Sequence, residues 1–323
     1  MTYAVPPATY DIEDHAYCVD SAADNAHRRH AMGIALRKTR LGPRAERRDD
    51  RPIHSIGSQR IFVANLIAFA RFLEVNHAGN LRCFAPDAPE AYLYARSRRV
   101  GESQLRLDRW ALQMLTGRRL PVFEPARPQK LKPRAYTAEQ IAAVAAHQTP
   151  WYAFSTWLAA AIGLRSMELI TIGPLDQQPR DPRPIPRYLH AYRPRGDLYS
   201  VAGKGGLVRT VLVPRPFIAR LEARLRPSPI IIRHRGKDLT SYYDIAGGKP
   251  WANSFTLACR RTFNTSAGAH GLRHTYTQSR IDVLLGHDIP ERDAKKAVSV
   301  EIGHFRVDVV DLYLRGTWNP ADW

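Results

Sequence analysis

The proline-rich segment at residues 120–136 is the feature that most constrains the fold of this chain. It reads LPVFEPARPQKLKPRAY, and each of its four prolines removes a backbone donor and restricts one dihedral angle. No long helix or central strand can run through it, so we predict an extended basic linker with folded segments on both sides. The 323 residues suffice for two domains with separate cores.

The charge balance indicates the kind of partner. The chain has 48 Lys and Arg residues against 30 Asp and Glu residues, a formal net charge of +18. The surplus occurs on both sides of the linker and is not confined to one tail. We therefore expect a polyanion, most simply nucleic acid, that contacts both halves of the chain.

Cysteine usage and hydropathy favour a cytoplasmic protein. Cys18, Cys83 and Cys259 lie far apart and form no CxxC pair, so neither a disulfide framework nor a zinc site is expected. The first residues lack a basic segment followed by an apolar one, and no stretch approaches 18 apolar residues. We expect no membrane association.

Residue patterns predict a mainly α protein with helices before the linker and an α+β part after it. Residues 1–50 are a polarised extension, acidic and then basic, and residues 51–119 form a helical domain. A glycine-containing turn joins two of the expected strands into one small antiparallel sheet. Helices are expected at 59–77, 89–96, 103–115, 138–147, 151–164, 216–225, 251–266, 270–283, 292–302 and 306–314, and strands at 187–193, 198–203 and 207–214.

Two segments after the linker place charged residues in distinctive settings. In AIGLRSMELI, Arg165 follows an apolar run, and Glu168 is close enough on the same helix face to hold its guanidinium. Taken alone, this segment is better explained by an intrahelical ion pair. In VAGKGGLVRTVLVP, Lys204 lies at a hairpin tip, where it can reach a ligand or simply be solvated. The string lacks the pattern of a nucleotide-binding P-loop.

Two further segments complete the set. In AHGLRHTYTQ, His270 and Arg273 share a helix face and can hold a phosphate between them, although a polar helix start is the simpler explanation. The pair His270 and His274 lacks the Glu of a zinc-binding HExxH motif. In VEIGHFRVDVVDLYLRG, Tyr313 follows His304 by nine residues within an apolar run, as a core tyrosine would.

Taken in order, these segments resemble the motifs of the tyrosine recombinases, the phage-integrase type of site-specific DNA recombinase. That family has Arg-x-x-Glu, a hairpin Lys, His-x-x-Arg, a Leu-Gly-His box and a Tyr nine residues after the box's His. The matching residues here are Arg165 and Glu168, Lys204, His270 and Arg273, Ile302-Gly303-His304, and Tyr313. The motifs cover about residues 130–323, and the family places a helical core-binding domain where we predict helices at 51–119.

The resemblance implies a catalytic domain at 137–323 and a role for each residue. Tyr313 would attack a DNA phosphate and form a 3′-phosphotyrosyl intermediate without any cofactor or metal. Arg165 and Arg273 would neutralise charge on the phosphate, and Glu168 would orient Arg165. The other three would move or donate protons: His270 as base or relay, Lys204 as acid for the leaving 5′-oxygen, and His304 as hydrogen-bonding partner.

This chain departs from the family pattern in three places. The box begins with Ile302 where Leu is usual, and a second string, Leu285-Gly286-His287, is rejected because nine residues beyond its His is a lysine. The segments 173–187 and 284–300 are longer than usual in the family.

The family often docks its C-terminal segment on a neighbouring subunit, for which Trp318 and Trp323 are the candidate anchors here.

The resemblance also implies partners and leaves alternatives open. Duplex DNA would be bound by a homotetramer on two synapsed sites, with an accessory DNA-binding protein as an option, and the protein would associate with the nucleoid.

Residues 1–50 are either an arm-type DNA-binding extension or a solvated segment. A type IB topoisomerase-like enzyme and a catalytically silent DNA-binding protein are the rival functions; among recombinase roles we favour a mobile element. The candidate DNA-contacting residues are Arg106, Arg109, Arg118, Arg119, Lys130, Lys132 and Arg134.

Overall fold

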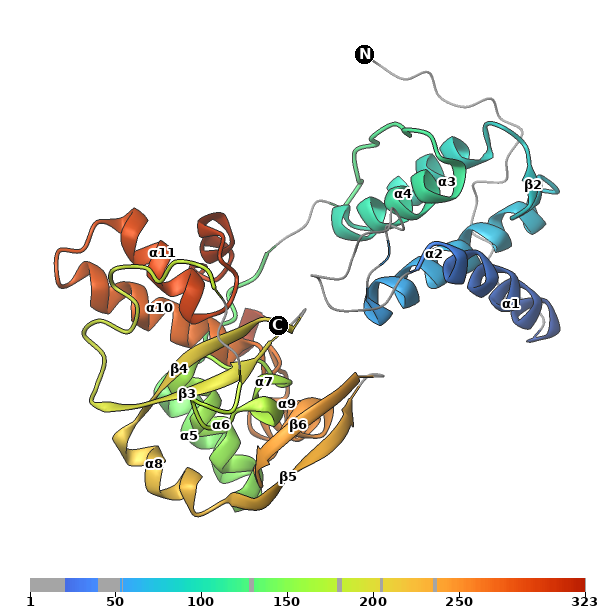
Figure 1. Cartoon of the computed structure of the whole chain (residues 1–323). Coiled ribbons are helices and arrows are strands. Elements are labelled where there is room, and N and C mark those ends of the chain that lie inside the picture. The colour runs from blue at the N-terminus through green and yellow to red at the C-terminus, as the bar shows by residue number, and fades with distance from the viewer. Residues whose placement is uncertain are drawn as a thin grey trace. The chain divides into compact units, whose positions relative to one another are not determined.

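The computed structural model describes residues 21–39, 53, 55–127, 131–178, 182–203, 206–234 and 237–322 (Figure 1). The chain divides into two compact units, Met1–Lys130 and Leu131–Trp323. The boundary between the units falls within the predicted linker. Lys130, Lys204, Trp323 and most of the predicted N-terminal extension lie outside the described residues.

The first unit is helical. It contains α1 (Ser21–Arg37), α2 (Ile56–Val75), α3 (Ala88–Ser97) and α4 (Glu102–Thr116), with a short hairpin of β1 (Gly79–Asn80) and β2 (Cys83–Phe84). The Ser55 hydroxyl accepts a hydrogen bond from the Ser58 backbone N–H and caps α2. Gly117, in the left-handed conformation at φ 72°, ends α4.

Helix α2 organises the core of the first unit. By length and composition it is the one helix in the described part of the chain that could cross a membrane. Its apolar residues instead pack inside the unit, where the Phe69 ring meets Tyr92 edge-on at 5.3 Å. Helix α1 joins the same core through Ala31, Ile34 and Ala35. The predicted boundary at residue 50 therefore does not separate an extension from this core.

The second unit combines helices with two antiparallel hairpins. One hairpin pairs β3 (Gly196–Ala202) with β4 (Val208–Pro214), and the other pairs β5 (Leu225–His234) with β6 (Lys237–Tyr243). Thr137 and Gln140 form a capping box at the start of α5. The helices are α5 (Ala138–Ala146), α6 (Pro150–Ile162), α7 (Glu168–Thr171), α8 (Arg215–Glu222), α9 (Gly248–Phe263), α10 (Gly271–Leu285) and α11 (Glu291–Glu301), followed by 3₁₀ turns at Val307–Leu312 and Pro320–Asp322.

The mainly α fold class is confirmed, with three local corrections. Residues 187–193 form turns, because His190 and Tyr192 have positive φ angles of 59° and 55° and the His190 N–H bonds to the Glu301 carboxylate. The hairpin β5–β6 was missed, so the second unit has two small sheets where one was expected. The helix expected at 306–314 is a 3₁₀ segment, Val307–Leu312.

Candidate active site

The buried carboxylate of Glu168 gathers three arginines. Its Oε1 accepts from Arg165 Nη1 at 2.6 Å, and its Oε2 accepts from Arg209 Nη2 at 3.0 Å and lies 3.7 Å from Arg273 Nη1. Burial by itself raises the pKa of Glu168, but Arg209, Arg273 and Arg165 outweigh it and lower that pKa to about 2. Glu168 is therefore ionised at neutral pH and fixes the positions of these guanidinium groups.

The chain around Gly163 explains how Arg165 reaches this position. Helix α6 ends at Gly163 in the left-handed conformation, and a Cβ there would meet the Tyr276 ring at 2.4 Å. Arg165 lies in the turn between α6 and α7, and its own backbone N–H donates to Glu168 Oε2 at 2.8 Å. The predicted pairing of Arg165 with Glu168 is present, but it spans a turn and is not on one continuous helix as expected.

Arg273 enters the site from the first turn of α10. Its side chain is fully buried, and Nη1 donates to the Gly163 carbonyl at 2.6 Å while Nε lies 3.4 Å from the Tyr313 hydroxyl. Burial lowers the pKa of Arg273 to about 10, against the opposing effect of Glu168, so the group is cationic at neutral pH. Its Nη2 is buried and has no hydrogen-bond partner among the described residues, which leaves one donor of the guanidinium unsatisfied.

The Ile-Gly-His box places His304 between an arginine and the tyrosine. Gly303 has a φ of 65°, and a Cβ there would come within 3.1 Å of Arg209 and 3.4 Å of Arg165. His304 Nε2 accepts from Arg165 Nη2 at 3.0 Å and lies 3.0 Å from the Tyr313 hydroxyl. Burial, Arg273 and Arg165 lower the pKa of His304 to about 3, so its imidazole is neutral at neutral pH.

Tyr313 follows the 3₁₀ turn after the box and is only 5% exposed. Its ring belongs to the apolar cluster of α10 and α11, as a core tyrosine would, but its hydroxyl faces polar groups. The hydroxyl lies within 3.4 Å of His304, Arg273 and His270. A tyrosine oxygen surrounded by one cation and two neutral imidazoles has a proton acceptor beside it.

Two histidines line the other side of Tyr313. His270, at the N-cap of α10, has its Nε2 3.4 Å from the Tyr313 hydroxyl, and burial together with Arg273 and His274 lowers its pKa to about 3. The His274 ring lies 4.6 Å from the Tyr313 ring, and burial lowers the pKa of His274 to about 4. Both imidazoles are neutral at neutral pH, so each has one ring nitrogen that can accept a hydrogen bond.

Arg209 on β4 is the site residue that sequence reasoning missed. It is 6% exposed; its Nη2 donates to Glu168 and its Nε donates to the Glu301 carbonyl at 3.0 Å, just before the Ile-Gly-His box. A signal was present in the sequence, because strand alternation places Arg209 on the same buried face as Val211 and Val213. A charged residue on the buried face of a strand requires a partner.

The structure brings together most of the predicted catalytic set. Arg165, Glu168, His270, Arg273, His304 and Tyr313 all lie within this cluster. Lys204 lies outside the described residues, but Gly203, next to it in sequence, is close to the cluster. A Cβ on Gly203 would come within 2.9 Å of Glu168 Oε1. The rejected string ends at His287, which is exposed and stacks on Tyr192 with 3.9 Å between ring centroids.

The candidate DNA-contacting residues differ in their surroundings. Arg106 and Arg119 are exposed. Arg109 and Arg134 donate to the carbonyls of Leu120 and Ala267, and Lys132 to that of Asp322. Arg118 bonds to the Pro86 carbonyl and to Glu90. These four side chains therefore also hold the protein together, and Lys130 lies outside the described residues.

The structure corrects the expectation for Trp318. This side chain is 1% exposed, and its ring packs against Tyr136 at 4.9 Å and Phe263 at 5.5 Å. Its backbone N–H donates to the Ala135 carbonyl at 2.6 Å. Trp318 anchors the C-terminal segment to its own unit and is not exposed for a neighbouring subunit. Trp323 lies outside the described residues.

The fold is that of the tyrosine recombinases, as the sequence motifs predicted. No protein-family model and no curated protein matches the chain. Among solved structures, the XerH site-specific recombinase bound to palindromic difH substrate in a post-cleavage complex is similar, with a TM-score of 0.52, 11% identity and coverage of 95% of both chains. The Tn1549 transposon integrase in complex with transposon right-end DNA has a TM-score of 0.50 and 13% identity, covering 90% of this chain and 97% of the other.

Proposed function

We propose that this protein is a site-specific DNA recombinase that cuts and rejoins DNA through a 3′-phosphotyrosyl intermediate. The observation that supports this most directly is the position of the Tyr313 hydroxyl, 3.0 Å from His304 Nε2 and 3.4 Å from Arg273 Nε. Binding DNA without cutting it would not require a buried tyrosine hydroxyl beside a cation and neutral bases. The shared fold agrees with the proposal.

The proposed reaction exchanges one phosphoester bond for another. The Tyr313 oxygen attacks phosphorus and gives its proton to His270, while Arg165 and Arg273 stabilise the charge that grows on the non-bridging oxygens and His304 adds a hydrogen bond. The bond from phosphorus to the 5′-oxygen breaks, and Lys204 donates a proton to that oxygen. A 5′-hydroxyl of another strand then attacks the phosphotyrosine, reforms the DNA bond and releases Tyr313.

A covalent adduct assay tests this proposal. Wild type, Tyr313→Phe and Tyr192→Phe are incubated with nicked duplexes from the DNA flanking the gene and resolved on denaturing gels. Tyr192 is 51% exposed and serves as the matched control. We expect an adduct with wild type and Tyr192→Phe, and none with Tyr313→Phe. DNA binding without any adduct would favour a silent DNA-binding protein, and an adduct that persists in Tyr313→Phe would direct the search to Tyr276.

We further propose a mobile element as the biological context, with integration and excision or cointegrate resolution as the reaction. A homotetramer on two duplex sites, with or without an accessory DNA-binding protein, would exchange the strands in the cytoplasm at the nucleoid. Incubation with two labelled sites distinguishes strand exchange from the relaxation of supercoils that a type IB topoisomerase-like enzyme would catalyse. Relaxation without exchange would contradict the recombinase proposal.

A further inference from the structure

The segment 182–193 lies against the Ile-Gly-His box, although it belongs to none of the sequence motifs. It begins within the proline-rich stretch 173–187, which is longer than usual in the family, and it forms turns and extended chain. We call residues 182–193 the strap. The side chains of Tyr188 and Ala191 in the strap pack against the apolar cluster of α10 and α11. The strap therefore contacts the same cluster as the Tyr313 ring.

Glu301, directly before the box, is the centre of a buried polar cluster. Its Oε1 accepts from the backbone N–H of His190 in the strap and from Arg280 Nη2, both at 3.0 Å. Its Oε2 accepts from the Tyr276 hydroxyl at 2.7 Å and from Arg280 Nε at 3.0 Å. Arg280 Nη2 also donates to the carbonyl of Ala191 in the strap at 2.9 Å. Glu301 thus connects α10 and α11 to the strap.

The backbone of Glu301 extends this connection to the candidate active site. Burial by itself raises the pKa of Glu301, but the hydrogen bonds and charge of Arg280 outweigh it and lower that pKa, so the carboxylate is ionised at neutral pH. The Glu301 carbonyl accepts from Arg209 Nε at 3.0 Å, and Arg209 Nη2 donates to Glu168 at 3.0 Å. Hydrogen bonds therefore run from the strap through Glu301 to Glu168, which holds the arginines of the site.

The strap also contacts the other side of the box, at Phe305. Arg183 Cζ lies 3.6 Å from the centroid of the Phe305 ring, a cation–π contact. Phe305 has a φ of 57°, which is unfavourable for a bulky side chain, and Gly303 has a φ of 65°. His304 therefore lies between two residues in the left-handed conformation. Such a backbone persists only where the surrounding structure holds it in place.

We propose that the strap positions His304 for DNA cleavage, through Glu301 before the box and Phe305 after it. The reaction that His304 serves here rests on the proposed function. His304 Nε2 lies 3.0 Å from the Tyr313 hydroxyl and accepts from Arg165 Nη2 at 3.0 Å. A displacement of the box by about 1 Å would break both contacts. Glu301 acts through the backbone of the box, so it is a positioning residue.

A double-mutant cycle tests the contact between the strap and Phe305. The rate of cleavage of saturating nicked duplex is measured at single turnover for wild type, Arg183→Met, Phe305→Leu and the double variant. Each single substitution removes one partner of the cation–π contact. We expect each single variant to cleave about tenfold more slowly, and the double variant to be no slower than the slower single variant. Losses that multiply in the double variant would show that Arg183 acts independently of Phe305 and would contradict the proposal.

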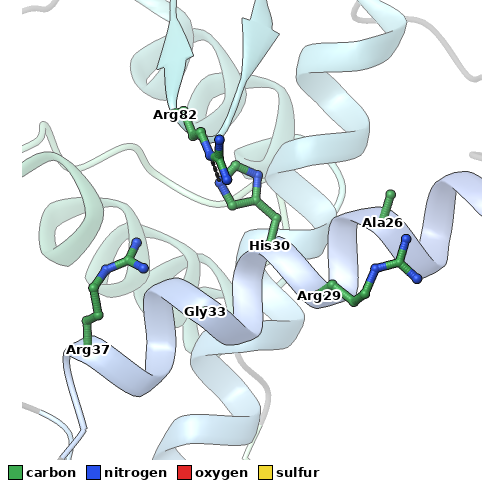
Figure 2. A pocket seen from close by; sticks show the side chains of 6 residues that line it. All are labelled: Ala26, Arg29, His30, Gly33, Arg37 and Arg82. Atoms are coloured by element: carbon green, nitrogen blue, oxygen red, sulfur yellow. Dashed lines mark hydrogen bonds between the residues drawn. The ribbon is translucent and has the colours of Figure 1, made fainter.

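Two arginines serve as controls for the loss of charge. Arg187 lies in the strap with its Cζ 5.4 Å from the centroid of the Tyr188 ring. Arg82 lies in the first unit, where Figure 2 shows it reaching His30, and its Nε donates to His30 Nε2 at 3.0 Å. Arg187→Met and Arg82→Met remove the same charge as Arg183→Met but keep the contact with the box. We expect both to cleave bound DNA at the wild-type rate, and equal losses in all three variants would overturn the proposal.

Glu301→Gln tests the other side of the box. The substitution keeps the size of the side chain but removes the charge that pairs with Arg280. We expect cleavage of bound DNA to slow by about 10²-fold in the wild-type background, but by less than about twofold in the His304→Ala background, where no imidazole remains to be positioned. The same loss in both backgrounds would show that Glu301 supports the unit in general, and it would overturn the proposal.

A milder pair of variants covers the case that Glu301→Gln does not fold, which thermal melts would show. Tyr276→Phe removes one hydrogen bond to Glu301. Tyr243→Phe is its matched control, because the buried Tyr243 hydroxyl donates to the carboxylate of Glu222 at 2.9 Å in the same unit. We expect Tyr276→Phe to cleave about fivefold more slowly than Tyr243→Phe, and only when His304 is present. Equal rates for the two variants would contradict the proposal.

These experiments distinguish the strap from the proposed function. Adduct formation by wild type reports on the enzyme, whereas the ratios between variants report on the strap. If wild type forms the adduct and the strap variants cleave like their controls, the strap proposal alone fails. If wild type forms no adduct with any duplex, both proposals fail, because the reaction that His304 would serve is absent.

Discussion

Tyr313 fits both the sequence pattern of a core tyrosine and the family pattern of a tyrosine nine residues after the His of the box. Its ring packs in the cluster of α10 and α11, which is why its sequence context is that of a core tyrosine. Its hydroxyl extends beyond that cluster to His304, Arg273 and His270. The two interpretations of the sequence therefore apply to different atoms of one side chain. Packing of the ring positions the oxygen for the reaction that we propose.

Arg209 is predicted to be a positioning residue for this chemistry. It connects β4 to Glu168 and to the backbone before the Ile-Gly-His box, and it contributes most among the charged groups that lower the pKa of Glu168. We expect Arg209→Met to slow cleavage of prebound DNA by about 10²-fold with little change in DNA affinity, because the guanidinium groups of Arg165 and Arg273 lose their alignment. Single-turnover cleavage and anisotropy measure the two effects separately.

The pH profile distinguishes positioning from simple loss of structure. Without Arg209 the pKa of Glu168 rises, so its carboxylate becomes protonated at a higher pH than in wild type. We expect the acid limb of the cleavage profile of Arg209→Met to move to higher pH, and Arg209→Lys to restore part of the shift. An unshifted profile with normal folding would contradict this role.

Among the secondary-structure elements, the end of α6 matters most for the site. Gly163 ends the helix at a φ of 67°, its carbonyl accepts from Arg273, and the Tyr276 ring occupies the space of a Cβ. We expect Gly163→Ala to destabilise the protein by more than the cost of about 1–2 kcal/mol of the left-handed conformation alone, because the ring must also move. Differential scanning calorimetry measures the loss.

Gly316→Ala is the matched control for that experiment. Gly316 lies in the same unit and also has a positive φ, of 86°, but no atom lies within 4 Å of the Cβ it would gain. It therefore reports the backbone cost without the collision. Equal losses of stability for the two substitutions would show that the Tyr276 ring adapts without cost.

The charge of the entire molecule bears on how the proposed recombinase would bind DNA. A net charge of +18, spread over both units, favours binding dominated by phosphate contacts and release of counterions. We expect duplex affinity to fall at least about 10³-fold between 50 and 200 mM salt, as for proteins with six or more phosphate contacts. A filter-binding or anisotropy titration measures it, and a nearly flat response would contradict binding dominated by phosphate contacts.

Local patterns in the sequence predicted the elements better than their pairing. Apolar periodicity identified α2 and α4, and Thr137 marked the start of α5, because these signals depend on neighbours three or four residues away. The turn that replaces the expected strand at 187–193 depends on Glu301, more than 100 residues away in sequence. The hairpin β5–β6 was missed because two prolines in β5 weakened its strand pattern.

The sequence by itself determined the fold class and most of the candidate site. The resemblance to the tyrosine recombinases predicted Arg165, Glu168, His270, Arg273, His304 and Tyr313 as one set, because the order and spacing of the short motifs can be read along the chain. Only the tertiary structure decided that Arg209 joins them, that Trp318 is buried in its own unit and that the strap holds Glu301. These contacts join segments that are far apart in the sequence. They depend on how the folded chain packs and pairs its buried charges, which local sequence patterns do not show.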